Sequence, residues 1–266
     1  MSDRDKFAVL RKCQRVWAVA AIHGEAERLA ALHRTLEPRF VAGDRLVYLG
    51  NYLGHGPDVR GTLDELLAFR RELIARPGMF AADVGYLRGS QEEMWQKLLQ
   101  LQFAPNPREV FAWMVEHGAG ATLTTYGGDI QQGFVCSRDG PLAITRWTSK
   151  LRTAMQAVPG HYALMSALRR AAYTDDGALL FVHAGLDADR PLSAQSDSLW
   201  WGTGSFAKLD RSYGGFIRVV RGFERSHAGI QTSQFTASID GGCGFGGPLI
   251  AACFDRRGEI VDSFEA

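Results

Sequence analysis

Gly43-Asp44-Arg45-Leu46-Val47-Tyr48-Leu49-Gly50 gives the clearest indication of the architecture of this chain. Arg45 to Leu49 has the length and apolar character of one buried strand, and Asp58 beyond it can cap the next helix. Upstream, Val16 to Ala21 predicts another buried strand and Glu25 to Leu36 an amphipathic helix. These segments predict a β-α-β beginning, with binding loops where the strands end and backbone N–H groups converge.

The later segments continue this alternation and then divide into two blocks. Phe80 to Leu87 predicts a strand, and Glu92 to about Leu101 a helix. Helical spacing from about residue 105 to 170 predicts a helical insertion or cap. From Ala178 the pattern is rich in strands and predicts a second sheet, formed mostly late in the sequence. Its expected strands are Leu179 to Val182, Ile217 to Val220, Thr236 to Ile239, Leu249 to Phe254 and Glu259 to Phe264.

The composition is that of a globular protein with a large core. Hydrophobic residues make up 46% and charged residues 22% of the 266 positions, which fit a single domain, 1–266, with its core from about residue 15. Thirty Lys and Arg nearly cancel 29 Asp and Glu, so neither nucleic acid nor a membrane surface is an expected partner. The charged segment from Met1 to Lys6, the absence of a long apolar run and four scattered cysteines predict a cytoplasmic protein with reduced thiols.

Five short segments lie at or near the expected strand ends. They are Ala20-Ala21-Ile22-His23-Gly24, Gly50-Asn51-Tyr52-Leu53-Gly54-His55-Gly56, Leu87-Arg88-Gly89-Ser90-Gln91-Glu92, Val182-His183-Ala184-Gly185 and Val219-Val220-Arg221-Gly222-Phe223. They resemble the GDxHG, GDxxDRG, GNHE, HAG and GH blocks of the calcineurin-like metallophosphoesterases. The resemblance implies an α/β fold, a four-layer α/β/β/α sandwich of two mixed sheets. It looks nearest to bacterial protein Ser/Thr phosphatases and symmetrical dinucleoside tetraphosphatases, and the sequence does not choose between them.

The resemblance also implies a two-metal site of Mn, Fe or Zn, and most of its ligand positions are altered here. Paired cations need bridging carboxylates and imidazoles. The matching positions are Ala21 for the first Asp, Asn51 for the bridging Asp, Ser90 for Asn, Phe223 for the last His, and the retained His23 and His183. No carboxylate remains among them, so we expect no metal cofactor, only a weak remnant of His23, Asn51, Ser90 and His183.

The groups that would transfer protons and hold phosphate are altered as well. The proton-donating His of the family matches Gln91, its supporting Asp matches Gly54, and the Arg of the second block matches His55. Arg88 matches the other phosphate-binding Arg. The carboxylates are lost together, which removes charges that would repel one another without cations.

Several retained residues keep two alternatives open. His23 and His183 are either packed remnants or ligand-binding groups, and His55 is either solvent-exposed or part of the cleft. Arg88 forms either an ion pair under its loop or an anion-binding group beside helix N-termini. The remaining candidates for a cleft or anion site are therefore His23, Asn51, His55, Arg88 and His183.

Four histidines and a pair of adjacent tryptophans lie outside the five motif segments. We expect His33, His117, His161 and His227 to be structural or surface residues. Trp200 and Trp201 match a Leu-Trp segment of the family, and we expect them in the core or in the wall of the cleft.

The leading prediction is a catalytically inactive homologue, a pseudophosphatase, that binds a protein partner or a phosphorylated ligand. The first alternative is an active phosphoesterase with a reduced or unusual metal site, which hydrolyses phosphoproteins or dinucleoside polyphosphates. It would use His23, His55 and His183 with a single weakly held metal or none. The second alternative is a structural or oligomerisation module whose cleft holds no ligand.

Overall fold

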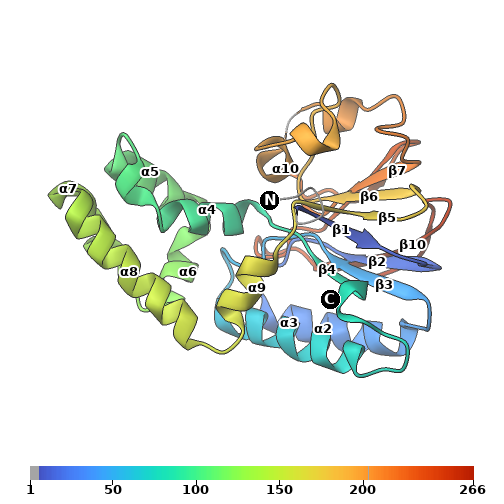
Figure 1. Ribbon diagram of the computed structural model, residues 1–266, viewed down its shortest axis with the longest axis horizontal. Coiled ribbons are helices and arrows are strands. Elements are labelled where there is room, and N and C mark those ends of the chain that lie inside the picture. The colour runs from blue at the N-terminus through green and yellow to red at the C-terminus, as the bar shows by residue number, and fades with distance from the viewer. Residues whose placement is uncertain (1–5, 203) are drawn as a thin grey trace.

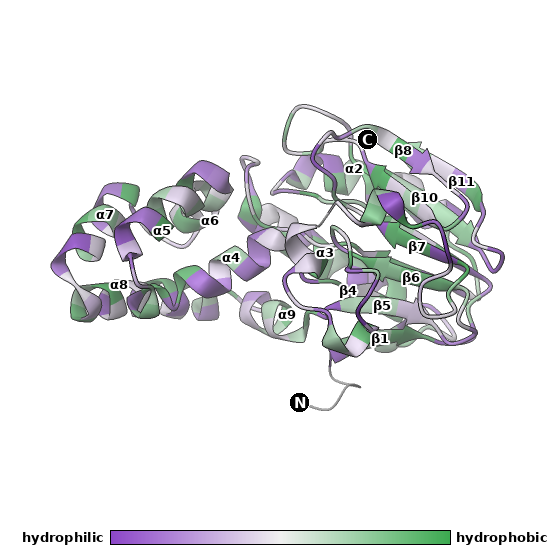
Figure 2. Cartoon of the chain, turned by 90° about the horizontal axis from the view of Figure 1, so that it is seen from above, coloured by the Kyte–Doolittle hydropathy of each residue, from purple (hydrophilic) through white to green (hydrophobic). Residues whose placement is uncertain are grey.

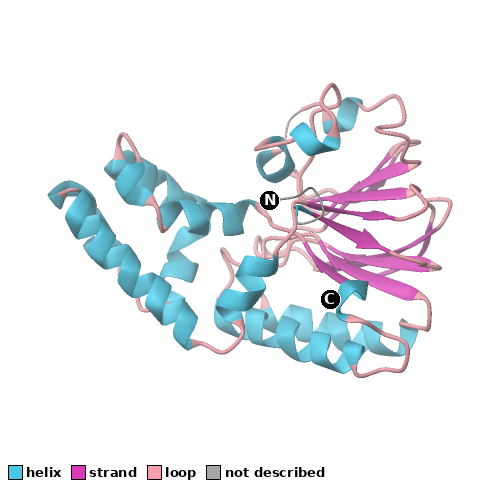
Figure 3. Cartoon of the chain, in the orientation of Figure 1, coloured by secondary structure: helices cyan, strands magenta, loops and turns pink. Residues whose placement is uncertain are grey.

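Two mixed sheets pack face to face at the centre of the protein, as a computed structural model of residues 6–202 and 204–266 shows (Figures 1 and 3). Of the charged N-terminal segment predicted above, Met1 to Asp5 lie outside the described residues. Side chains from both sheets share one continuous core, which includes Trp17, Phe181 and Phe254. The predicted α/β sandwich of two mixed sheets is confirmed.

The first sheet has five strands and contains the β-α-β beginning. In spatial order its strands are β11 (Ile260–Glu265), β10 (Ile250–Asp255), β2 (Arg15–Val19), β3 (Asp44–Tyr48) and β4 (Val84–Tyr86). Strands β2, β3 and β4 run parallel, and β10 and β11 are antiparallel to their neighbours. Helices α2 (Ala26–Leu36) and α3 (Val59–Ile74) cover the outer face (Figure 1). As predicted, the Asp58 side chain caps α3 by accepting a hydrogen bond from the Gly61 N–H at 2.7 Å.

The second sheet has six strands and draws on both ends of the chain. In spatial order they are β1 (Phe7–Leu10), β5 (Ala171–Thr174), β6 (Leu179–Val182), β7 (Arg218–Arg221), β9 (Thr236–Asp240) and β8 (Gly229–Thr232). Its outer face carries the short helix α10 (Ser198–Trp201) and irregular chain (Figure 1). The second helical layer of the sandwich is therefore thin.

A helical arm projects from one side of the sandwich, as Figure 2 shows from above. Its helices are α4 (Ser90–Leu98), α5 (Pro107–Met114), α6 (Gly120–Thr125), α7 (Ile130–Asp139) and α8 (Pro141–Ala157), and α9 (His161–Ala167) leads back to the sandwich. A kink at His117 and Gly118, where Gly118 has φ +99°, separates α5 from α6. The predicted helical insertion over residues 105 to 170 is confirmed. Among the described residues, none of the helices combines the length and the apolar character that a membrane span requires.

Three strands, β1, β5 and β8, were not predicted, and one, β4, is shorter than predicted. Strand β1 precedes the expected start of the core at residue 15, and it is too short for a periodic pattern to stand out. Strand β8 is an exposed edge strand and lacks the alternation of a half-buried one. Of Phe80 to Leu87, only β4 pairs as a strand, because Ala81–Asp83 forms a 3-10 turn.

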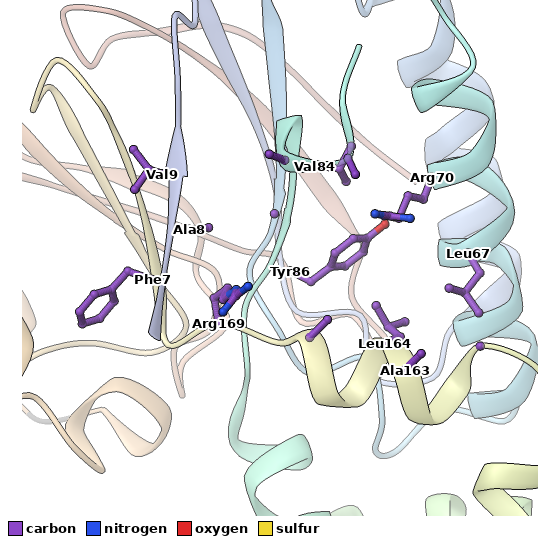
Figure 4. Close-up of a pocket in the computed structure, with 15 residues that line it drawn as sticks. Phe7, Ala8, Val9, Leu67, Arg70, Val84, Tyr86, Ala163, Leu164 and Arg169 are labelled. Carbon is purple, nitrogen blue, oxygen red and sulfur yellow. The ribbon is translucent and has the colours of Figure 1, made fainter. Parts of the chain in front are cut away.

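A cavity of about 470 Å³ lies between the outermost strands β1 and β4 and is closed by α3 and α9 (Figure 4). Leu67, Leu164 and Tyr86 give it an apolar wall, and Arg70 and Arg169 line it as well. Its lining includes no residue from the five motif segments among the residues that the structure describes. The motif segments therefore form a different site.

Candidate functional site

The motif loops follow β2, β3, β4, β6 and β7, and the backbone ties them together. The N–H groups of Ile22 and His23 both donate to the Asn51 carbonyl, at 3.1 and 2.5 Å, and the Gly222 N–H donates to the His183 carbonyl at 3.0 Å. His23 and Asn51 have φ angles of +58° and +54°, a region that non-glycine residues seldom occupy. Such a conformation persists only where its surroundings impose it, so the loops hold one another in place.

Glu92 joins two of these loops from within the core. Its fully buried carboxylate accepts hydrogen bonds from the N–H groups of Asn51, Leu53 and Gly89, at 2.9, 3.0 and 2.8 Å. Burial raises the pKa of Glu92, and these N–H bonds oppose that rise. The sequence prediction assigned Glu92 no role, although the last position of its motif block was the available signal.

Both polar atoms of the Asn51 side-chain amide form hydrogen bonds. Its Oδ1 accepts from the Gln91 N–H at 2.9 Å and from the Ser90 hydroxyl at 3.2 Å, which caps the start of α4. Its Nδ2 must then donate to Nε2 of His23, 3.1 Å away, so the neutral His23 ring carries its proton on Nδ1. A carboxylate has no N–H to donate to this ring nitrogen. The structure thus brings together His23, Asn51, Ser90 and Gln91 through a network that uses an amide.

The ring of Phe223 contacts both retained histidines. It stacks on His183 with centroids 5.4 Å apart and lies 5.8 Å from His23. Both imidazoles are buried, and Nδ1 of His183 donates to the Leu49 carbonyl at 2.6 Å. Nδ1 of His23 and Nε2 of His183 have no hydrogen-bond partner among the described residues. Burial lowers the pKa of His23 well below its usual range and that of His183 to about 4, so both rings are neutral at neutral pH.

These donors do not fit a two-metal centre. Of the two ring nitrogens that lack a partner among the described residues, Nε2 of His183 has a free lone pair, whereas Nδ1 of His23 carries a proton. Ala21 and Phe223 offer no donor atom, and the Asn51 amide is committed to neighbouring groups. Bridged divalent cations require anionic oxygen donors, which are absent from the matching positions. Nowhere in residues 6–202 and 204–266 do three or more His, Cys, Asp or Glu side chains form a group that could hold a metal ion.

Three other altered positions hold the helical arm against the motif loops. Nε2 of Gln91 donates to the His117 carbonyl at the kink, at 2.7 Å. A Cβ atom at Gly54, whose φ is +124°, would lie 2.9 Å from Nδ1 of His23 and 3.0 Å from Cγ of Gln91. A Cβ atom at Gly118 would lie 2.6 Å from Nε2 of His55. Gly54, His55 and Gln91 thus fit one another and the arm.

A cavity of about 540 Å³ opens between the motif loops and the arm. The loops contribute His23, His55, Ser90, Gln91 and Phe223, and Trp200 and Trp201 line it as the sequence predicted for a cleft wall. The arm contributes Trp113 and His117, and the late loops contribute His227 and Phe245.

Two of the four histidines outside the motif blocks line this cavity, and two are structural. His117 and His227 meet His23 and His55 there, which sequence reasoning missed because their partners lie far away along the chain. His33 bonds to Glu65 and the Tyr48 hydroxyl, and His161 bonds to Asp64 and the Tyr126 hydroxyl, as expected of structural residues.

Arg88 lines a separate cavity of about 320 Å³ between α4 and the helices α8 and α9. Its guanidinium forms an ion pair with Glu93 at 3.2 Å and a hydrogen bond with Gln96. Of the two alternatives for Arg88, the ion pair is present in the structure. Arg88 does not line the cavity beside His23, and neither does the buried His183.

Comparison with solved structures extends over almost the whole chain. A crystal structure of a candidate diadenosine tetraphosphatase has a TM-score of 0.60 and 19% identity, over 98% of each chain. A mutant form of a cold-active protein tyrosine phosphatase has a TM-score of 0.56 and 12% identity, over 98% of this chain and 85% of the other. The cold-active protein tyrosine phosphatase of a psychrophilic Shewanella species has a TM-score of 0.52 and 13% identity, with the same coverage. No family sequence model and no curated protein matches.

The architecture and these similarities define the class of protein. The chain has the calcineurin-like metallophosphoesterase fold, as the motif segments predicted. Structural similarity at such low sequence identity shows the fold alone, so any activity has to be argued from the chemistry of the site.

Proposed function

We propose that this protein is a non-catalytic member of the metallophosphoesterase fold that acts by binding a ligand in the cavity between the motif loops and the arm. The observation that carries the proposal is the position of Phe223, whose phenyl ring contacts both retained imidazoles where the family has a metal-binding histidine. A phenyl ring cannot coordinate a cation, and a buried cation needs compensating charge.

The position of the general acid supports the same proposal. The Gln91 amide has no acidic proton to transfer to a leaving group at neutral pH, and its Nε2 is hydrogen-bonded to the His117 carbonyl of the arm. The proposal includes no metal cofactor, a cytoplasmic location, and a protein partner or a small molecule as the ligand. A phosphorylated ligand has less support, because the retained Arg88 lines another cavity.

Titration calorimetry with Mn²⁺ on the purified protein tests this proposal, together with turnover of aryl phosphates, phosphopeptides and dinucleoside polyphosphates. We expect no saturable Mn²⁺ binding in the micromolar range and no turnover. The matched control restores the ligands by Ala21→Asp, Asn51→Asp, Ser90→Asn and Phe223→His. Micromolar Mn²⁺ binding by the natural protein, with turnover that rises as metal is added, would refute the proposal.

The second candidate function is an active phosphoesterase with a reduced metal site. It is favoured by one observation, the two buried ring nitrogens of His23 and His183 that lack partners among the described residues. The free lone pair on Nε2 of His183 could hold a single cation, and the Nδ1–H of His23 could donate to a polar ligand atom. Under this alternative His183→Ala abolishes any turnover, and turnover that survives the substitution comes from a contaminant.

A further inference from the structure

Aromatic rings line the cavity between the motif loops and the arm from two opposite elements. On the loop side, Phe245 lies 4.6 Å from the ring of His55, 5.0 Å from His23 and 4.6 Å from His227, on which it stacks. On the arm side, Trp113 stacks on His117 at 4.2 Å. Both are large hydrophobic side chains that remain exposed, Phe245 by 48% and Trp113 by 41%.

The lining carries little net charge. Among the described residues that line it, Glu116 and Arg225 are the permanently charged side chains, and their charges are opposite. Burial lowers the pKa values of His23 and His55, which keeps these two rings neutral at neutral pH. His227 is paired with the buried Asp240 at 2.8 Å. A phosphate dianion would meet a single guanidinium here, whereas phosphate sites use several cationic or N–H donors.

The polar atoms of the lining suit a ring with polar edges. His23, His55, Ser90 and Gln91 line the cavity together with Phe245 and Trp113, so imidazole, hydroxyl and amide side chains lie beside the exposed rings. The volume of about 540 Å³ lies within the usual range of small-molecule sites, about 300–1,000 Å³.

We propose that this cavity binds an uncharged planar heteroaromatic ring, which contacts the faces of Phe245 and Trp113 and forms hydrogen bonds to the imidazoles. The inference rests on the proposed function, because it takes the cavity to be a binding site free of metal. It replaces the phosphorylated ligand with a ligand class that lacks phosphate.

Three small probes distinguish binding of an uncharged aromatic ring from binding of a phosphate group or of an aliphatic ring. Benzimidazole is an uncharged aromatic bicycle, phenyl phosphate carries an aromatic ring with a dianion, and cyclohexanol lacks an aromatic face. Ligand-observed NMR at neutral pH measures all three. We expect saturable binding of benzimidazole, about tenfold tighter than that of either other probe. Cyclohexanol lacks the aromatic contact, and the dianion of phenyl phosphate would meet a single guanidinium.

Variants at exposed positions keep the test independent of folding. Phe245→Ser and Trp113→Ser are each expected to weaken benzimidazole binding about tenfold. Phe103→Ser is the matched control, since Phe103 is 79% exposed and does not line the cavity, and it should leave binding unchanged.

A capped glycyl-tryptophyl-glycine peptide distinguishes two sources of the ring. Binding as tight as that of benzimidazole supports an aromatic side chain of a partner protein, and weaker binding supports a free small molecule; both outcomes support the ligand class.

Tighter binding of phenyl phosphate, equal binding of cyclohexanol, or no binding of any aromatic probe would overturn the inference. These outcomes leave the Mn²⁺ titration unaffected. A protein that binds neither metal nor ring therefore retains the proposed absence of catalysis and loses this inference alone.

Discussion

Two neighbouring parts of the motif region differ in whether their buried polar atoms have hydrogen-bond partners. Around Glu92, a buried carboxylate is matched by three backbone N–H donors from two loops. Around Phe223, two buried imidazoles each keep one ring nitrogen without a partner in the described structure, and a phenyl ring contacts both. The first part is satisfied by the protein alone. In the second part, one nitrogen of each imidazole lacks a hydrogen-bond partner among the described residues.

This difference indicates that the backbone conformation of the loops and the chemistry of the site depend on different residues. The loop conformation depends on Glu92 and on glycines at crowded positions, such as Gly89, where a Cβ atom would lie 2.3 Å from Oδ1 of Asn51. None of these groups requires a metal ion. The loops can therefore keep their shape whichever side chain occupies position 223.

The largest expected effect is that of removing the Glu92 carboxylate. Glu92→Ala leaves three buried N–H groups without an acceptor, so we expect the free energy of unfolding to fall by about 3–5 kcal/mol. Urea denaturation measures the change. Glu92→Gln, which keeps one acceptor oxygen, should lose less, and a loss below about 1 kcal/mol for Glu92→Ala would show that the loops do not depend on this residue.

We expect the free energy of unfolding to fall in acid because His183 becomes protonated. Its pKa is about 4 in the folded protein and about 6.5 in an unfolded chain, so the unfolded state binds one more proton between these values. The contribution of His183 is complete above pH of about 6.5 and falls by about 1.4 kcal/mol per pH unit as the pH drops toward 4.

Comparison with His183→Asn isolates this effect. The raised pKa of Glu92 acts in the opposite sense, since its contribution grows as the pH falls, but it is common to both proteins. Urea titrations across the acidic range should give a flatter pH dependence for the variant. Parallel curves for the two proteins would contradict the assignment of a depressed pKa to His183.

A side chain at position 54 should strain the contact between the loop and the arm. Gly54→Ala adds a Cβ atom within 2.9 Å of His23 at a φ of +124°, and we expect a loss of about 2–3 kcal/mol. The matched control is Gly78→Ala, which has a φ of +78° with nothing within 4 Å and should lose about 1 kcal/mol. Equal losses in thermal or urea denaturation would show that the crowding at Gly54 is relieved without cost.

The smallest expected effect concerns the hydrogen bond between Gln91 and the arm. Gln91→Ala removes one bond to the His117 carbonyl, so we expect global stability to fall by about 1 kcal/mol. Hydrogen exchange should increase around the kink between α5 and α6, with the exposed Gln131→Ala as a control that leaves it unchanged. Unchanged exchange in Gln91→Ala would show that other contacts hold the arm.

Much of the fold was predictable because strands and helices follow periodic apolar patterns. The β-α-β beginning, the helical insertion and the five late strands are confirmed. The assignment of all five late strands to the second sheet was wrong, because β10 and β11 extend the first sheet beside β2. The short strands β1, β5 and β8 were not predictable, because four residues carry little periodicity and their pairing depends on distant partners. The motif segments also placed His23, Asn51, Ser90 and Gln91 in one site, and the structure brings them into contact.

The sequence by itself determined which chemical groups the site contains, because the loss of a carboxylate at Ala21 and Asn51 holds in any conformation. Only the tertiary structure decided which groups meet. Arg88 faces a separate cavity, and His117 from the arm joins His23 beside the motif loops. Contacts between segments so far apart depend on the path of the backbone and on packing, which no local pattern of residues encodes.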